Sequence, residues 1–191
     1  GVTRLADTAG RQDRREDDTK AAKILRHQDA SSLLRFMREQ ATRIHHPHVV
    51  TPLGWAGEDD DVLFTMPLMR GGSVATLLGD HGALPEQWVA ELLAQTLDGL
   101  AAVHAAGVVH RDLKPDNIML VERDGDPDFA KVLDFGIAKL RTDEGDGQKA
   151  LTQIGSVFGT PEYMSPEQAM GEPVDARSDL YALGMILYEM L

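Results

Sequence analysis

A highly charged turn lies between two apolar segments in the stretch VVHRDLKPDNIMLV, residues 108–121. One His, one Arg, two Asp, one Lys and one Asn fall within the eight positions 110–117. The apolar residues on either side, 108–109 and 118–121, predict strands that become buried. Two buried strands would hold the segment between them rigidly, so the sequence predicts a fixed turn that presents several charged side chains at one place.

The charged side chains have the spacing that phosphoryl transfer requires. This reaction needs a group that orients the attacking hydroxyl, metal ions that bridge the phosphates, and cations that neutralise developing charge. Asp112 can accept the hydroxyl proton, Lys114 can reach the transferred phosphate, and Asn117 can bind a metal ion through its amide oxygen. Rigid flanking segments provide the positioning that such a site needs.

The overall charge argues against one class of partner. The 191 residues include 19 Lys and Arg against 31 Asp and Glu, so the net charge is −12. Nucleic-acid binding needs a basic face, and we therefore expect no nucleic acid among the partners. An anionic ligand can still bind where a few cations converge.

Three further absences from the sequence guide the interpretation. The chain has no Cys, so neither disulfides nor thiolate metal sites contribute. No apolar run reaches the ~18–20 residues that a membrane helix needs, and no signal peptide opens the chain. The chain starts with Gly rather than Met, so we expect a fragment of a longer protein.

Strand patterns come first in the chain and helix patterns later. Apolar residues predict strands at 20–25 and 60–69, and two short strand-turn units around the acidic turn RDGDPD, with the second unit at 130–140. Helical spacing of apolar residues predicts helices at 29–45, 85–105 and 177–191. This order favours an α+β fold of two lobes with a hinge near residues 67–72.

Four motifs resemble those of eukaryotic-type protein kinases, and their residues are similar to those of bacterial serine/threonine kinases. HRDLKPDN looks like the catalytic loop of this family, and DFG, at 134–136, lies 17 residues after Asn117 as in the family. GTPEYMSPE, at 159–167, resembles the end of the activation loop, and RSDLYALGMILYEML resembles the helix that follows it. The resemblance implies the two-lobed protein-kinase fold, incomplete at both ends, with an N-lobe at about 1–69 and a C-lobe at about 70–191.

The resemblance also implies a nucleotide site for ATP with Mg²⁺ or Mn²⁺. Metal would bind to Asn117 and Asp134, and Lys23 would hold the α- and β-phosphates, with Glu39 as its ion-pair partner. The other residues that it assigns to the nucleotide are Gly1 of the glycine-rich loop, Ala21 and Met119 above and below the adenine, Met66 as gatekeeper, and Pro67 and Met69 in the hinge.

Regulation by phosphorylation is a further implication of the resemblance. In this family, an Arg directly before the catalytic Asp, here Arg111, marks kinases whose activation loop is ordered by a phosphate. Thr152, with Ser156 second, is the expected phosphorylation site. The family's equivalent of Thr160 instead bonds the catalytic Asp and Lys. Glu167 normally pairs with an Arg from later helices, so we expect it to lack that partner here.

The expected activity is transfer of the ATP γ-phosphate to Ser or Thr hydroxyls of proteins, with self-association for autophosphorylation. The expected location is the cytoplasm, or the cytoplasmic face of a membrane if an anchor lies outside this chain. One alternative is a silent pseudokinase that serves as a scaffold, although such proteins usually lose one of Asp112, Asn117 and Asp134. The other is a small-molecule kinase, which the peptide-type activation segment disfavours.

Several histidines invite a different interpretation. HHPH, at 45–48, has three His in four residues, but Pro47 breaks the helix pattern and no carboxylate or Cys backs the cluster, so we expect no metal there. His104 and His110 are expected to be interior histidines with hydrogen-bond partners rather than proton shuttles.

Overall fold

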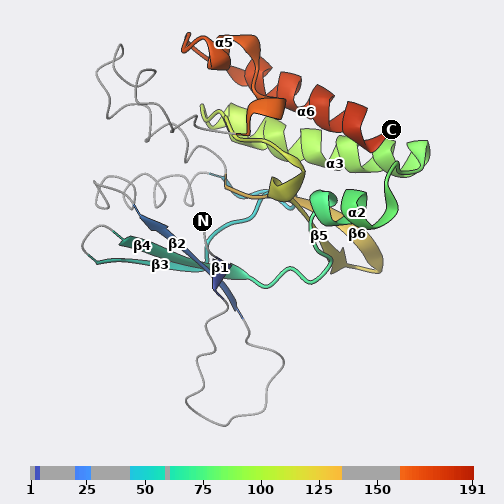
Figure 1. Cartoon of the computed structure of the whole chain (residues 1–191). Coiled ribbons are helices and arrows are strands. Elements are labelled where there is room, and N and C mark those ends of the chain that lie inside the picture. Colours follow the sequence, from blue (N-terminus) through green and yellow to red (C-terminus); the bar gives the residue numbers. More distant parts are fainter. Residues whose placement is uncertain (1–2, 5–19, 27–43, 59–60, 135–159) are drawn as a thin grey trace. The chain divides into compact units, whose positions relative to one another are not determined.

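A computed structural model of the chain describes residues 3–4, 20–26, 44–58, 61–134 and 160–191 (Figure 1). The chain divides into two compact units. The first comprises Gly1–Arg43 and Thr51–Met69, and the second comprises Ile44–Val50 and Arg70–Leu191. Residues 44–50 therefore belong with the second unit, although a division at residue 69 assigns them to the first.

An antiparallel sheet of four strands forms the described part of the first unit. The strands are β1 (Thr3–Arg4), β2 (Lys20–Arg26), β3 (Gly54–Glu58) and β4 (Asp61–Pro67), in the order β1-β2-β4-β3. The strands predicted at 20–25 and 60–69 are confirmed. β3 was not predicted, because its segment GWAGE has two glycines and hence a weak strand pattern.

Two long helices form the main part of the second unit and lie side by side (Figure 1). α3 (Glu86–Ala105) starts after Pro85 and ends just before Gly107, whose φ of +76° suits glycine. α6 (Ala176–Met190) starts after Asp175, whose carboxylate accepts a bond from the Arg177 N–H. Both predicted helices are confirmed. The buried core that joins them to the rest of the unit consists of Val74, Val89, Leu92, Leu100, Leu113, Ile118, Leu120, Ala130, Val132, Ala182, Leu183, Ile186 and Met190.

The charged turn is followed by a β-hairpin. β5 (Ile118–Arg123) pairs antiparallel with β6 (Asp126–Val132) through Asp124 and Gly125, which both have positive φ, 53° and 87°. Positive φ at both turn residues is typical of a tight hairpin and favours Asp-Gly. α3 packs against β6, where the Gln95 side chain accepts a bond from the Ala130 N–H at 2.7 Å.

The apolar residues before the charged turn do not form a strand, so that part of the prediction is wrong. Val108 is buried, but it packs with Ile44, Val49 and Val103, and its N–H bonds the Val103 carbonyl at the end of α3. Residues 108–109 follow closely after the helix that ends at Ala105, and two residues are too few to form a separate strand there. The charged turn therefore joins a helix to a strand.

Four short elements complete the described part of the second unit. They are α2 (Val74–His81), the 3₁₀ turns η1 (Pro115–Asn117) and η2 (Pro161–Tyr163), and α5 (Pro166–Ala169). The sequence analysis missed α2, which has only eight residues and too little length for a clear apolar period. Its N-terminal signal is a capping box between Ser73 and Thr76.

Some predictions concern residues outside the described ranges. Gly1, Glu39, Thr152 and Ser156 are among them, as is most of the helix predicted at 29–45. The last two residues of that helix, Ile44 and His45, are described and are not helical. No helix in the described part of the chain is long and apolar enough to cross a membrane.

We expect Gly99→Ala to destabilise the protein by about 1–3 kcal/mol, because overpacking forces backbone shifts. A Cβ at Gly99 would lie 2.8 Å from the His48 carbonyl oxygen, a backbone atom that cannot move aside cheaply. Gly184→Ala is the matched control, since a Cβ at this position on α6 meets nothing within 4 Å. It should stabilise by roughly 0.5–1 kcal/mol through helix propensity. Urea unfolding of both variants measures the difference, and equal shifts of the same sign would contradict this packing.

Candidate active site

The charged turn is held by one buried carboxylate on α6. Asp179 is 1% exposed and accepts bonds from the backbone N–H groups of His110 and Arg111, both at 2.8 Å. Its Oδ2 also lies 2.7 Å from Nε2 of His104 on α3. A carboxylate that accepts three hydrogen bonds fixes the backbone at the start of the turn. Asp179 is thus the side chain that ties the turn to both long helices.

His110 links the turn to the end of β6. Its ring is fully buried, and Nδ1 accepts the Asp112 N–H at 3.3 Å. Nε2 lies 2.6 Å from the Leu133 carbonyl oxygen, so the tautomer that satisfies both contacts carries its proton on Nε2. The prediction that His104 and His110 are interior histidines with partners is confirmed.

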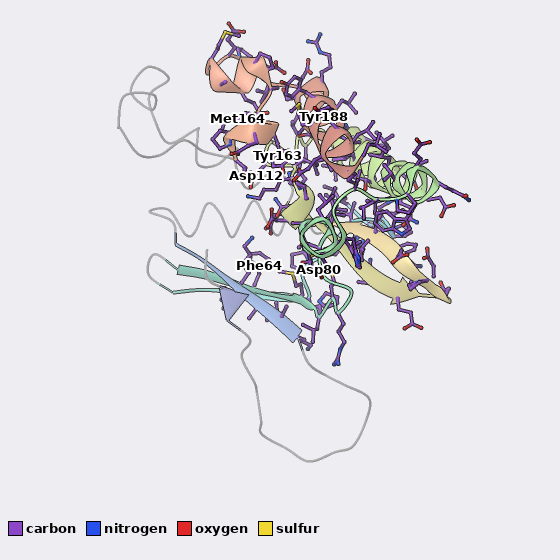
Figure 2. All side chains as sticks on the ribbon, turned by 45° about the vertical axis from the view of Figure 1, so that its right-hand side comes forward. Phe64, Asp80, Asp112, Tyr163, Met164 and Tyr188 are labelled. Carbon is purple, nitrogen blue, oxygen red and sulfur yellow. The ribbon has the colours of Figure 1, made fainter. Side chains whose placement is uncertain are left out.

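Asp112, Lys114 and Thr160 converge beside a small pocket in the second unit. Lys114 Nζ lies 3.4 Å from Oδ2 of Asp112 and donates to Oγ1 of Thr160 at 3.1 Å. The side chains of Asp112 and Lys114 are 31% and 24% exposed, so both can meet a ligand. The residues that line the pocket include Asp112, Thr160, Tyr163 and Met164. Figure 2 labels three of them, Asp112, Tyr163 and Met164. The contact predicted between Thr160 and Lys114 is present.

Asn117 has its amide orientation fixed by the turn itself. Nδ2 donates to the Asp112 carbonyl oxygen at 2.6 Å, and the residue is 6% exposed. Since the nitrogen is used in this bond, Oδ1 is the atom left to act as an acceptor or ligand. The Leu133 N–H bonds the Asn117 carbonyl at 2.9 Å, which holds the residue before Asp134 against Asn117.

Backbone strain occurs at both ends of this arrangement. Arg111, directly before Asp112, has a φ of 68°, and Asp134 has a φ of 61°. Residues other than glycine rarely adopt this left-handed region, and such conformations gather at functional sites where the surrounding structure holds them. The bonds that the Arg111 N–H donates to Asp179 and the Leu133 N–H donates to the Asn117 carbonyl are part of that support.

The first unit brings three of the predicted nucleotide residues onto one face of its sheet. Ala21 and Lys23 are two residues apart on β2, and Ala21 lies opposite Met66 on β4. Alternate residues of a strand, and directly opposed residues of an antiparallel pair, share a face. Met66 is buried and Lys23 half-buried. Pro67 ends β4, and Met69 lies two residues later, at the end of this unit.

Met119 is on β5 of the second unit and is half-buried. Its neighbours Ile118 and Leu120 belong to the core, so Met119 lies on the opposite face of the strand. It forms an isolated bridge with Ser73, just before α2.

The segment from Thr160 to Gln168 borders the pocket and is tied to α6. The Tyr163 hydroxyl donates to the Glu189 carboxylate, and burial, this bond and nearby carboxylates raise the pKa of Tyr163. The Ser178 hydroxyl donates to Glu167 Oε1 at 2.6 Å, and this bond lowers the pKa of Glu167. The partner of Glu167 in the described part of the chain is thus the Ser178 hydroxyl, and the absence of the Arg partner stays a prediction.

Two residues of this site escaped the sequence analysis. The sequence motifs assign no role to Asp179, or to Gln168, which donates from Nε2 to the Arg111 carbonyl at 2.8 Å. Their contacts join residues 68, 69 and 57 positions apart, so no local pattern indicates them. For Asp179, an acidic residue in a predicted apolar helix was the available signal.

Two of the histidines at 45–48, His46 and His48, are engaged in ordinary contacts. His46 Nε2 lies 3.3 Å from Asp98 Oδ2, and His48 Nδ1 lies 2.8 Å from the Ala130 carbonyl oxygen. The ring of His48 stacks on Phe129, with centroids 4.2 Å apart. Among the residues that the structure describes, no group of three or more His, Cys, Asp or Glu side chains could hold a metal ion.

Comparison with known proteins identifies the family. Residues 8–191 match the model of the protein kinase domain. The chain is 57% identical over 148 residues to "Serine/threonine-protein kinase Pkn1" of Myxococcus xanthus, covering 78% of this chain and 20% of that protein. It is 46% identical over 181 residues to "Serine/threonine-protein kinase pkn3" of the same organism, covering 92% of this chain and 33% of that protein.

Similarity of structure agrees with this match. The crystal structure of Rad53 1-466 in complex with AMP-PNP superposes with a TM-score of 0.71 at 26% identity, covering 91% of this chain and 41% of that one. The chain spans a third or less of the length of the two curated relatives above. With its α+β fold and a domain match over nearly its whole length, this chain belongs to the protein kinase family.

Proposed function

We propose that the protein transfers the γ-phosphate of ATP to Ser and Thr hydroxyls of other proteins. The observation that carries the proposal is the convergence of the Asp112 carboxylate, the Lys114 ammonium group and the Thr160 hydroxyl beside one pocket. In this arrangement Asp112 orients the acceptor hydroxyl and takes its proton, and Lys114 neutralises charge on the transferred phosphate. Thr160 keeps Lys114 beside Asp112.

Asn117 and Asp134 are the proposed ligands of Mg²⁺ or Mn²⁺. Members of this family generally use ATP with a divalent metal ion, and both residues offer the oxygen ligands that these hard cations prefer. The bond from Asn117 Nδ2 to the Asp112 carbonyl supports this role, because it leaves the amide oxygen as the available ligand atom. The metal, when bound, would neutralise charge on the phosphates.

The nucleotide is proposed to use residues of both units. Lys23 would bind the α- and β-phosphates and pair with Glu39, and Gly1 would belong to the loop above them. Ala21, Met66, Pro67, Met69 and Met119 would surround the adenine. The shared face of Ala21, Lys23 and Met66 on the first sheet supports this assignment. On this proposal the two compact units correspond to the N-lobe and the C-lobe predicted at about 1–69 and 70–191, except that residues 44–50 belong with the second unit.

Serine and threonine are proposed as acceptors rather than tyrosine. The relatives that match the chain are named serine/threonine-protein kinases, and Lys114 with the GTPEY segment matches that branch of the family. Retention of Asp112, Asn117 and Asp134 disfavours a silent scaffold.

Phosphorylation of the activation loop is the proposed regulation. A phosphate on Thr152, or second on Ser156, would accept bonds from Arg111 and add roughly −1.5 to −2 charge. Self-association would allow one copy to phosphorylate another. The proposed location is the cytoplasm or the cytoplasmic face of a membrane.

The test is phosphotransfer by the full-length protein. Purified protein with radiolabelled ATP and Mg²⁺ should label a general protein substrate and itself, and acid hydrolysis should release phosphoserine and phosphothreonine. Mass spectrometry of the labelled protein locates its own sites. Absence of label with both Mg²⁺ and Mn²⁺, or label on tyrosine alone, would contradict the proposal.

A further inference from the structure

The side chain of Gln168 joins two segments that are 57 residues apart in the chain. Its Nε2 donates to the Arg111 carbonyl at 2.8 Å. Its Oε1 accepts from the Ser165 N–H at 3.3 Å and from the Ser165 hydroxyl at 3.2 Å. The Ser165 hydroxyl in turn accepts the Gln168 N–H at 3.4 Å and caps α5. One amide therefore serves as the cap of α5 and as a donor to the charged turn.

The carbonyl that Gln168 contacts belongs to a strained residue. Arg111 has a φ of 68°, and such a conformation persists only where neighbouring groups hold it. Its N–H is held by Asp179 on α6, and its carbonyl is held by Gln168 on α5. The peptide groups on both sides of the Arg111 Cα thus have side-chain partners, and the next residue is Asp112. A shift at the Arg111 carbonyl turns the peptide that carries the Asp112 N–H.

Gln168 also lines the pocket beside Asp112, together with Tyr163 and Met164 of the preceding segment. The segment is also fixed by the bond from Ser178 to Glu167 and by the contact of Tyr163 with Glu189. The described part of the segment 160–168 is therefore attached to α6 on one side and, through Gln168, to the charged turn on the other.

We propose that Gln168 is a positioning residue that couples the segment 160–168 to Asp112. The inference rests on the proposed function, in which Asp112 acts on the acceptor hydroxyl at the pocket that this segment lines. By holding the Arg111 carbonyl, Gln168 keeps Asp112 in a fixed position relative to the segment 160–168, on which a substrate would lie. A misplaced catalytic group lowers turnover even when the substrate still binds.

The position requires an acceptor for Ser165 and a donor for the Arg111 carbonyl. Glutamine provides both because its amide has a donor and an acceptor on one rigid plane. An ionised glutamate has the same length and can still accept from Ser165, but it cannot donate to the Arg111 carbonyl. Alanine does neither. Gln168→Glu thus keeps the cap of α5 and removes the coupling, which separates the two roles of the side chain.

The experiment compares Gln168→Glu and Gln168→Ala with wild type in the full-length protein. At a pH of about 8 we expect kcat for protein substrates to fall about tenfold or more in both variants, since the half-buried Arg111 carbonyl loses its donor. The KM for ATP should stay within about twofold, because the coupling acts on Asp112 and not on nucleotide binding. Gln87→Glu, an exposed glutamine on α3, is the control with the same change of charge and should keep wild-type kcat.

The pH profile distinguishes coupling from a merely structural role. The introduced carboxyl group faces the Arg111 carbonyl oxygen and shares its pocket with the carboxylates of Asp112 and Asp179 and with the Arg111 side chain. The carbonyl oxygen and the two carboxylates favour the protonated form and raise its pKa above the usual value of about 4.3. Below that raised pKa the group is protonated and can donate again. The activity of Gln168→Glu relative to wild type should therefore recover as the pH falls toward about 5.5, whereas the ratio for Gln168→Ala should stay low. A ratio near one for Gln168→Glu at every pH would overturn the proposal.

Hydrogen exchange supplies a measurement that does not depend on activity. Amides of residues 110–112 should exchange about tenfold faster in Gln168→Glu than in Gln87→Glu, since the Arg111 carbonyl loses its partner. Equal exchange in the two variants would also overturn the coupling. If wild type transfers no phosphate but exchange accelerates as expected, the proposed function fails and the positioning role of Gln168 stands.

Discussion

Asp134→Asn is expected to lower phosphotransfer by at least about a thousandfold, because the charge stabilisation that a metal ion supplies is worth several kcal/mol. Asparagine has nearly the same shape as aspartate but lacks the negative charge that balances a divalent cation. The rate of γ-phosphate transfer at saturating ATP, measured over a range of Mg²⁺ concentrations, gives the result. Turnover close to that of wild type would remove Asp134 from the metal site.

Asp124→Asn is the matched control for this variant. Asp124 has a φ of 53°, close to the 61° of Asp134, and lies in the turn between β5 and β6. Asparagine tolerates the left-handed conformation well, so the substitution changes the charge without disturbing the backbone. We expect Asp124→Asn to keep wild-type activity. A comparable loss in both variants would indicate that the backbone conformation, and not metal binding, explains the effect.

Asp179→Ala is expected to destabilise the protein by about 3 kcal/mol or more and to abolish turnover in the molecules that remain folded. The substitution leaves the N–H groups of His110 and Arg111 without their acceptor, and each buried donor left in this way costs about 1–3 kcal/mol. Chemical unfolding of the full-length protein measures the stability. The strained φ of Arg111 also loses one of its supports, so Asp112 is no longer held in place.

Asp80→Ala provides the comparison for Asp179→Ala. Asp80 is exposed on α2, where Figure 2 labels it, and a surface substitution of this kind changes stability by roughly 0.5 kcal/mol at most. Similar unfolding free energies for the two variants would show that Asp179 does not hold the charged turn.

Much of the site could be predicted because it depends on residues that are close in the sequence. Asp112, Lys114 and Asn117 lie within six positions, and the bonds from Asn117 to Asp112 and to Lys114 are formed inside the turn. The helices 85–105 and 177–191 have clear apolar periods, and the strand at 20–25 has the β-branched and apolar content of a strand. Local patterns of this kind are what sequence analysis detects best.

The remaining features depend on contacts across long sequence distances. Asp179 reaches the charged turn from 69 residues away, and Ser178 supplies a bond to Glu167 that the expectation of a distant Arg had not considered. Residues 108–109 have β-branched side chains, yet they form no strand, and Val108 packs in a small cluster with Ile44 and Val49 because α3 ends just before it. Tertiary packing overrides strand propensity at such positions.

Gln168 illustrates the same limit at the level of function. In the sequence it follows the motif that resembles the end of an activation loop, and its spacing from Ser165 indicates a capping box but not the contact with Arg111. Its donor meets the Arg111 carbonyl only because α5 and the charged turn lie next to the same pocket.

The central claim is that Asp112 orients and deprotonates the acceptor hydroxyl, and Asp112→Asn tests it most directly. The measurement is the rate of γ-phosphate transfer to a Ser/Thr protein substrate by the full-length protein, beside the Kd for ATP of wild type and variant. We predict a rate lower by about a hundredfold to ten-thousandfold, the usual contribution of a positioned base, with the Kd for ATP changed by no more than about threefold. A variant that transfers phosphate at the wild-type rate would contradict the account.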